Sequence, residues 1–176
     1  ERKVVYSLAA LYTFRMLGLF MLLPVLAVYG TEYEHHSPFL LGLALGAYGF
    51  SQALLQIPFG VLSDRVGRKP LILIGLIIFT LGSVVAALAD SVYGLIIGRF
   101  LQGGGAISAV VMALLTDLTS DENRTKAMAT IGASIGVSFS VAMTLGPVLA
   151  GWAGVGTIFW LTAILGLVGI YILWAM

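Results

Sequence analysis

The chain has no cysteine among its 176 residues and few charged residues, and both absences narrow what it can be. Without cysteine there is no disulfide framework, no thiol nucleophile and no thiolate metal site. Charged residues make up 10% of the sequence, whereas a soluble domain carries roughly 25%. Hydrophobic residues make up 60%. This composition predicts a membrane protein with several spanning segments.

Six apolar stretches are long enough to cross a bilayer. They lie at about 7–29, 39–62, 71–89, 92–116, 127–150 and 158–176. Backbone amides in lipid have to be hydrogen-bonded within their own segment, so each stretch is predicted to be a helix and the protein to be all-α. The chain starts without Met and ends within the sixth stretch, so we expect 1–176 to be one bundle of a longer protein.

Basic residues are missing from the connections at 30–38, 90–91 and 151–157. Seven of the nine basic residues lie at the opposite ends of the helices, namely Arg2, Lys3, Arg65, Arg68, Lys69, Arg124 and Lys126. Cytoplasmic connections of membrane proteins are enriched in Lys and Arg. Both ends of the chain are therefore predicted to be cytoplasmic.

Acidic residues are missing from the interior of the spans, where the charged and amide side chains are Arg15, Gln52, Gln56, Arg99 and Gln102. Such groups are costly against lipid and normally face a protein interior or a cavity. We expect spans 1, 2 and 4 to line an interior with span 5 beside them, and spans 3 and 6 to face lipid. These spans therefore hold no deep carboxylate that could carry a proton. Either a carboxylate outside this chain carries it, or Asp64 at a span boundary does, or the protein is driven by something other than protons.

Two roles are open for each of these polar residues. Arg99 lies about seven residues, roughly 10 Å, into the fourth span. It is predicted either to take part in coupling or substrate contact or to pair with backbone carbonyls. Arg15 is either functional or extends toward the surface. Gln52 and Gln56 are one turn apart on one helix face, where they would bind polar groups of a substrate or form hydrogen bonds between helices.

A short charged segment at 60–70 separates spans 2 and 3. Gly60 would let the second helix approach a neighbour, and Gly67 would permit a tight turn. Asp64 and Asp117 each lie at the C-terminal end of a helix, where the macrodipole disfavours a negative charge. The three nearby basic residues are Arg65, Arg68 and Lys69. We interpret the segment as an ion-pair latch that forms in only some conformations; the alternative is a solvated connector whose charges only set topology.

The two halves of the chain share a faint pattern. Arg15 to Gly18 in span 1 corresponds to Arg99 to Gly103 in span 4. Glycines 42 and 46 followed by proline 58 in span 2 correspond to glycines 132 and 136 followed by proline 147 in span 5. This order favours a 3+3 inverted repeat, an arrangement found in secondary transporters.

Four motifs resemble those of the major facilitator superfamily. The segment between spans 2 and 3 is similar to that family's motif at the same place, as Gly60-x-x-x-Asp64-Arg65-x-Gly67-Arg68-Lys69. Span 4 resembles its helix-4 motif, as Arg99-x-x-Gln102-Gly103-x-Gly105-Ala106. Span 5 resembles its antiporter motif for helix packing, as Gly132, Gly136, Gly146-Pro147 and Gly151. Span 1 resembles the signature of its twelve-helix drug:proton antiporters, as Leu17-Gly18 and Leu23-Pro24-Val25. Ala150 stands where the helix-5 motif has the first of two paired glycines.

The resemblance implies the N-terminal half of a transporter built from two six-helix halves. It implies proton-coupled efflux of a small, apolar or drug-like compound by alternating access in a bacterial inner membrane. Asp64, Arg68 and Asp117 would hold the outward-facing state against a helix of the other half, and Arg99 would take part in proton coupling. The expected partners are the substrate, protons, the bilayer and the missing half, with no nucleic acid.

Other functions are also considered. A six-helix structural or sensory module in the membrane, without transport, is the alternative. An enzyme, a cofactor or a metal site is not expected, because the spans hold no nucleophile–base pair, no ligand cluster and no phosphate-binding glycine loop. A cavity lined by apolar side chains would suit the substrate predicted above, and the candidates are Met21, Tyr48, Phe50, Met112 and Met143.

Overall fold

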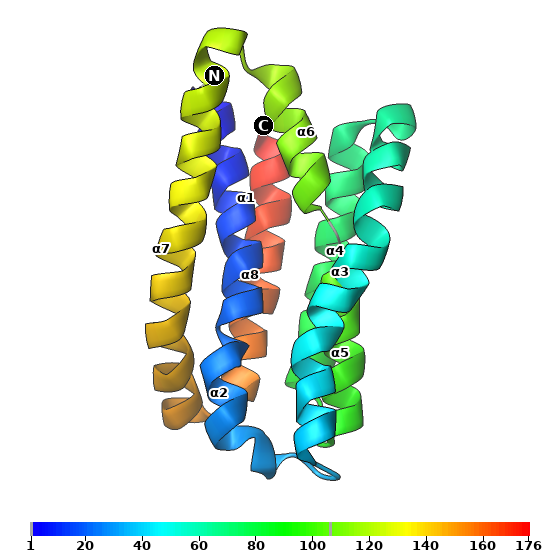
Figure 1. The fold of residues 1–176 in the computed structure, drawn as a ribbon, viewed down its shortest axis with the longest axis vertical. Helices are drawn as coiled ribbons and strands as arrows, with labels where there is room; N and C mark the ends of the chain where they lie inside the picture. Colours follow the sequence, from blue (N-terminus) through cyan, green and yellow to red (C-terminus); the bar gives the residue numbers. More distant parts are fainter. Residues whose placement is uncertain (1, 106) are drawn as a thin grey trace.

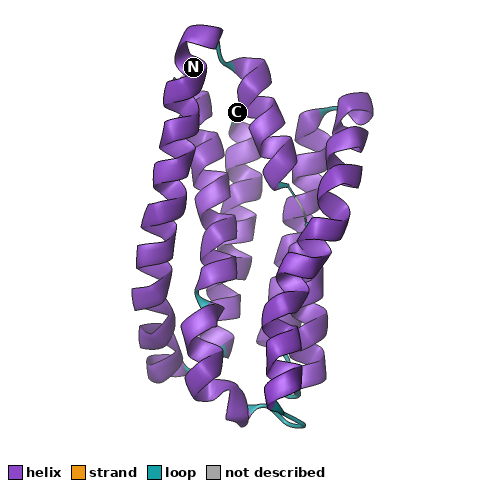
Figure 2. Ribbon diagram, viewed as in Figure 1, coloured by secondary structure: helices purple, strands orange, loops and turns teal. Residues whose placement is uncertain are grey.

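The protein is a bundle of long, roughly parallel and antiparallel helices (Figure 1). A computed structural model describes residues 2–105 and 107–176, so Ala106 of the fourth-span motif lies outside the described residues. Figure 2 shows helices joined by short connections, with no strand in the described ranges. The elements in chain order are α1 (Arg2–Phe20), α2 (Leu22–Tyr29), the 3-10 turn η1 (Gly30–Glu32), α3 (Pro38–Val66), α4 (Arg68–Ala87), α5 (Val92–Gly104), α6 (Ser108–Leu118), α7 (Asp121–Ala153) and α8 (Gly156–Ala175).

All six predicted spans are present as helices long and apolar enough to cross a membrane. They cover Lys3–Glu32, Pro38–Val66, Arg68–Ala87, Val92–Leu118, Asp121–Ala153 and Gly156–Ala175. The helices extend beyond the predicted ends most clearly in α3 and α7, which have 29 and 33 residues. The reason is that backbone hydrogen bonding continues past the apolar run. In α7 it begins with Asp121 and Glu122, whose charges suit a helix N-terminus.

Spans 1 and 4 are each interrupted, which the apolar pattern did not predict. α1 ends at Phe20, whose carbonyl cannot receive a hydrogen bond from Pro24 four residues later. α5 ends in a run of three glycines, and Gly105 leaves the helical region with φ −79° and ψ 57°. The amide of Ile107 then donates to the Gly105 carbonyl at 2.8 Å. The two broken spans are the first helices of the two proposed repeat units.

The packing of the helices follows an inverted repeat. α1 packs mainly against α7 and α8, while α5 packs mainly against α3 and α4. An inverted repeat pairs span 1 with span 4, span 2 with span 5 and span 3 with span 6. The contact of α1 with α7 then corresponds to that of α5 with α3, and the contact of α1 with α8 corresponds to that of α5 with α4. The remaining large contact, α4 with α8, joins the two third helices to each other. The fold is therefore a six-helix membrane bundle with 3+3 inverted symmetry.

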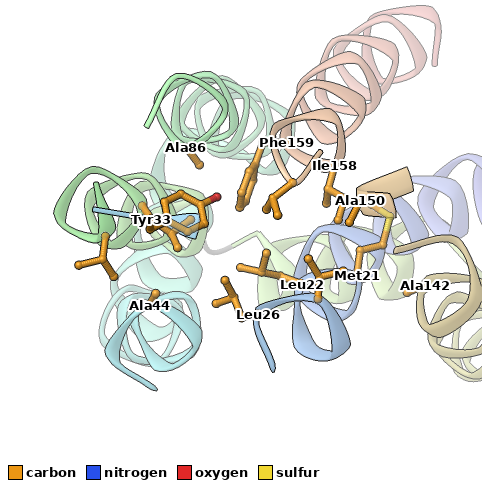
Figure 3. Packing of buried hydrophobic residues seen from close by; sticks show 14 of the residues in the cluster. Met21, Leu22, Leu26, Tyr33, Ala44, Ala86, Ala142, Ala150, Ile158 and Phe159 are labelled. Atoms are coloured by element: carbon orange, nitrogen blue, oxygen red, sulfur yellow. The ribbon is translucent and has the colours of Figure 1, made fainter. Parts of the chain in front are cut away.

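Two apolar clusters fill the two ends of the bundle. One lies toward the end that lacks basic residues, and Figure 3 shows Leu22, Leu26, Tyr33 and Phe159 of this cluster lying between their helices. The other lies toward the charged end and includes Leu8, Leu71, Leu115 and Leu173 among its buried residues. Neither cluster contains the buried polar residues of the middle of the bundle. The clusters therefore enclose a polar layer between them.

Close helix contacts depend on glycine at several places, including Gly103 and Gly146. A Cβ added to Gly103 would collide with the backbone carbonyl of Tyr48 in α3, and one added to Gly146 would lie 2.5 Å from the Met21 carbonyl. Gly60, Gly132 and Gly136 were also expected to allow close packing of helices, but they make no such contact in this chain. No atom of another described element lies within 4 Å of a Cβ built on them, so the close approach expected at these glycines is absent from this half.

A pair of neighbouring substitutions tests the close contact of α5 with α3. Gly103→Ala should lower the midpoint of thermal unfolding in detergent, because overpacking against a fixed backbone costs about 1–3 kcal/mol. Gly104→Ala is the matched control, since its nearest neighbour would be Ser51 Oγ at 3.4 Å, an ordinary contact. Equal midpoints for the two variants would show that the contact is looser than described.

Candidate functional site

The connection between α3 and α4 consists of one residue. α3 ends at Val66 and α4 begins at Arg68. Gly67 between them has φ 115°, in the region that favours glycine, and its amide donates to the Ser63 carbonyl at 3.0 Å. The tight turn predicted at Gly67 is thus confirmed. This turn fixes the side chains that follow α3 and begin α4 in one geometry.

Arg68 joins three helices at this end of the bundle. Its Nη1 donates to Asp64 Oδ1 of α3 at 2.6 Å, and its Nε donates to Asp117 Oδ2 of α6 at 3.0 Å. Nη1 also donates to the Ser63 hydroxyl at 2.6 Å, and that hydroxyl donates to the Gly60 carbonyl at 2.7 Å. The structure therefore brings Asp64, Arg68 and Asp117 together. Ser63, which sequence reasoning missed, holds Arg68 against α3.

Other residues of the predicted latch lie outside this cluster. Arg65 and Lys69 are exposed and form no ion pair with any residue in the described ranges. A separate pair joins Arg124 to Asp121 at 2.8 Å within α7. At this end of the bundle, only Arg68 links different helices by ion pairs among the described residues.

The ion pairs of Arg68 are weak because they face water. The side chain of Asp64 is 62% exposed and that of Asp117 is 50% exposed. Ion pairs in such surroundings contribute about 0.2–1 kcal/mol each and are screened by salt. The cluster can therefore form and break at small energetic cost, which suits a contact that differs between two states.

Arg15 crosses the middle of the bundle from α1 to α5. It is 2% exposed, and its Nη1 donates to the Gln102 carbonyl at 3.1 Å. Its Nη2 donates to Gln52 Oε1 at 2.8 Å and to the Gly103 carbonyl at 3.4 Å. Arg15 is therefore inside the bundle and does not extend to the surface.

Arg99 makes the reverse connection from α5. It is fully buried, and its Nη1 donates to the Gly18 carbonyl of α1 at 2.9 Å and to Gln102 Oε1 at 3.1 Å. Its Nε donates to the Ala44 carbonyl of α3 at 3.3 Å. Each arginine thus donates to the carbonyl that lies three residues after the other arginine. This exchange has the symmetry of the inverted repeat.

The helix breaks explain how two cations are buried without a bonded carboxylate. The last four carbonyls of a helix have no partner within it. Gly18 lies in the last turn of α1, and Gln102 and Gly103 lie in the last turn of α5. A helix C-terminus also favours a positive charge. The two guanidiniums therefore donate to carbonyls in the last turns of the interrupted helices.

Tyr48 of α3 lies against both guanidiniums. The Cζ atoms of Arg15 and Arg99 are 5.2 Å and 4.8 Å from its ring centroid, within the range of cation–π attraction. Its hydroxyl donates to the Arg15 carbonyl at 3.2 Å. Met21 and Tyr48 are buried at 0% and 1% exposure, so these two lining candidates do not face a cavity. The candidates Phe50 and Met143 are exposed on the surface of the bundle, which a residue lining a substrate cavity between two halves would have to be.

Gln102 extends the polar layer to spans 3 and 6. Its Nε2 donates to the Ser83 hydroxyl of α4 at 2.9 Å and to the Thr162 hydroxyl of α8 at 3.4 Å. Thr162 also donates to Ser83 at 3.0 Å. Spans 3 and 6, which were expected to face lipid, thus each also place one polar side chain inside the bundle. Sequence reasoning missed Ser83 and Thr162, although both are small polar residues in otherwise apolar helices.

The two glutamines predicted in span 2, Gln52 and Gln56, have different surroundings. Gln52 bonds Arg15, whereas the Oε1 of Gln56, one turn further on, is buried and bonds no residue in the part of the chain that the structure describes. In this chain the two buried arginines contact backbone carbonyls, the side-chain amides of Gln52 and Gln102, and the ring of Tyr48. For Arg99, pairing with backbone carbonyls was one of the two predicted roles. The arrangement as a whole has a tightly bonded middle and an exposed, exchangeable contact at one end.

The comparisons with known proteins agree on one family. The sequence profile described as Major Facilitator Superfamily matches residues 8–176. The inner membrane transport protein YajR of Escherichia coli (strain K12) is 55% identical over 97% of this chain and 37% of its own length. The class B tetracycline resistance protein of Escherichia coli is 31% identical over 78% of this chain and 34% of its own length. The matched family and YajR are transporters, which are not enzymes.

A solved structure shows the same fold. The crystal structure of the peptide transporter POT in complex with sulfate matches with a TM-score of 0.83 at 18% identity. The match covers 98% of this chain and 37% of that one. The chain thus spans less than half the length of each protein named here.

Two matched substitutions test the polar layer. Gln102→Leu should lower the free energy of unfolding by about 1–3 kcal/mol, because Ser83, Thr162 and Arg99 would each lose a buried partner. Gln56→Leu should change it much less, since Gln56 Oε1 has no partner to lose. Unfolding of the detergent-solubilised protein, followed by tryptophan fluorescence, measures both. A layer that does not stabilise the bundle would give both variants the same stability.

Proposed function

The chain belongs to the major facilitator superfamily, and we propose that it is the N-terminal half of a secondary transporter that works by alternating access. Its cargo in this proposal is a small apolar or drug-like compound that is exported in exchange for protons. The class B tetracycline resistance protein is a relative named for resistance to such a compound, which supports efflux.

The second half would dock on α3 and α7. Only 17% of the most apolar stretch of α3 and 22% of that of α7 are buried, less than in the other spans. Glycines 42, 46 and 49 of α3 and glycines 132 and 136 of α7 present open backbone there. Small residues at a helix surface permit close helix–helix contact in membranes. The glycines that pack against nothing in this half are thus available to a partner helix.

The observation that carries this proposal is the sharing of Arg68 by Asp64 and Asp117. Three helices meet at one partly buried guanidinium, and both carboxylates remain at least half exposed. A conformational cycle needs contacts that differ between its states. We assign that role to this cluster, with Gly67 setting its geometry and Arg65 at its edge. A helix of the second half would complete the contact in the outward-facing state.

The polar layer would let this half move as one body. Arg15, Arg99 and Gln102 tie α1, α3, α4, α5 and α8 together by hydrogen bonds in a buried region. Hydrogen bonds to charged groups contribute about 1.5–3 kcal/mol each, more than an exposed ion pair. Rocking between the halves would therefore break the contacts at the end before those in the middle.

Proton coupling would need a carboxylate from the second half. Neither buried arginine bonds a carboxylate in the described residues, and the acids of this chain lie outside the spans or at their ends. The Nε of Arg15 and the Nη2 of Arg99 are buried and have no hydrogen-bond partner among the described residues. These two donors are available to an acid or substrate when the helices shift, and this is how Arg99 would take part in coupling.

The orientation follows from the charges. Figure 1 places both chain ends and the α3–α4 turn at the same end of the bundle, where the basic residues gather. The positive-inside rule makes this the cytoplasmic end. A relative named as an inner membrane protein supports a bacterial inner membrane.

Substitution of Asp64 tests the proposed latch. Asp64→Asn in the full-length protein should slow export by up to about 5-fold, because loss of an exposed ion pair worth about 0.2–1 kcal/mol shifts the balance of states by a factor of that order. Arg68→Ala and Asp117→Asn should act in the same direction. Accumulation of a panel of lipophilic compounds in cells, with and without a protonophore, measures export. Spin-label distances between the halves at the charged end should lengthen in the same variants.

Asp121→Asn is the matched control, because Asp121 is 92% exposed at the same end and, among the described residues, its only ion pair is with Arg124 of its own helix. It should export at the unaltered rate. Normal export and unchanged distances in all three cluster variants would reduce the segment to a connector that only sets topology.

A further inference from the structure

An apolar groove runs between α4 and α8 near the charged end of the bundle. It has a volume of about 800 Å³, and its lining includes Lys69, Leu73, Leu167, Tyr171 and Trp174. Both helices are membrane spans. The groove therefore opens toward the surroundings of the bundle, on helices other than the two with open glycines.

Lys69 supplies the charge of this groove. It directly follows Arg68, but Arg68 is occupied by Asp64 and Asp117, whereas no described residue forms an ion pair with Lys69. Its side chain is exposed in the first turn of α4. A lysine beside an apolar surface keeps its stem on that surface and its ammonium in the polar region. The charge of Lys69 is therefore free for a group from outside the bundle.

Two aromatic residues place this part of the groove at the membrane surface. Tyr171 is 66% exposed and Trp174 is 84% exposed, both in the last turns of α8. Exposed Tyr and Trp of membrane helices gather where hydrocarbon meets the headgroups. The end of the groove that carries Lys69 thus lies at headgroup depth, with Leu73 and Leu167 toward the hydrocarbon.

We propose that this groove binds an anionic phospholipid, with its phosphate on Lys69 and an acyl chain along Leu73 and Leu167. An apolar groove on membrane helices that ends in an unpaired ammonium matches such a lipid in both polarity and charge. Arg68, the residue before Lys69, holds the carboxylates of Asp64 and Asp117. Anionic lipid is attracted to lysine at the membrane surface by about 1 kcal/mol per residue, equivalent to about 5-fold enrichment.

Quenching of Trp174 fluorescence tests this site directly. The full-length protein, with its other tryptophans replaced by Phe, is reconstituted in vesicles of phosphatidylcholine and phosphatidylglycerol, one of which is brominated on its acyl chains. Brominated phosphatidylglycerol should quench Trp174 as if enriched about 5-fold over its share of the vesicle. Brominated phosphatidylcholine should quench it less than its share predicts.

Three variants separate the role of Lys69 from general surface charge. Lys69→Gln should abolish the preference for phosphatidylglycerol, and Lys69→Arg should retain it. Lys126→Gln removes an exposed lysine at the same end of the bundle, on α7, and should also leave the preference unchanged. Equal quenching by both lipids, or an unaltered preference in Lys69→Gln, would overturn the proposal. Absence of quenching by either lipid would mean that polypeptide covers the groove, and would overturn it as well.

Discussion

The structure depends on one reciprocal arrangement: Arg15 and Arg99 each donate hydrogen bonds to backbone carbonyls of the helix that carries the other arginine. A cation inside a membrane bundle is costly unless its donors are satisfied. Here the acceptors are carbonyls in the last turns of α1 and α5. Arg15 of α1 donates to the end of α5, and Arg99 of α5 donates to the end of α1. Unbroken helices would have used those carbonyls themselves. The interruptions of spans 1 and 4 and the buried arginines therefore depend on each other.

Interaction strength varies along the bundle in a way that suits movement. In the middle, buried donors and acceptors join the two repeat units, and two apolar clusters enclose that layer. At the charged end, the contacts of Arg68 are exposed and weak. A half built in this way is rigid where it must keep its shape and adjustable where it would meet its partner. The two open glycine faces on α3 and α7 lie on the sides of the bundle that its own helices leave uncovered.

Much of the fold could be predicted from the sequence because membrane insertion is decided by local composition. The six spans and the turn at Gly67 follow from apolar length and from the conformational freedom of glycine. Asp64 and Asp117 attract notice because each lies at an unfavourable helix end. The breaks at Phe20 and Gly105 follow from Pro24 and from the glycine run, which apolar length does not register. The parts played by Ser83 and Thr162 depend on which helices meet in space. Apolar patterns carry no such information, which is also why Gly60 was expected to pack against a neighbour.

The most direct test of the account is whether this half keeps its shape while the transporter changes state. Cysteines are introduced for spin labels at Leu81 of α4 and Val168 of α8, which are 57% and 41% exposed, belong to opposite repeat units and lie away from the faces proposed to meet the second half. This chain has no native cysteine to interfere. The distance between the labels in the full-length protein is then measured under conditions that change the distance between the halves. The account predicts one unchanged distribution within this half; a second or shifted distribution would contradict it.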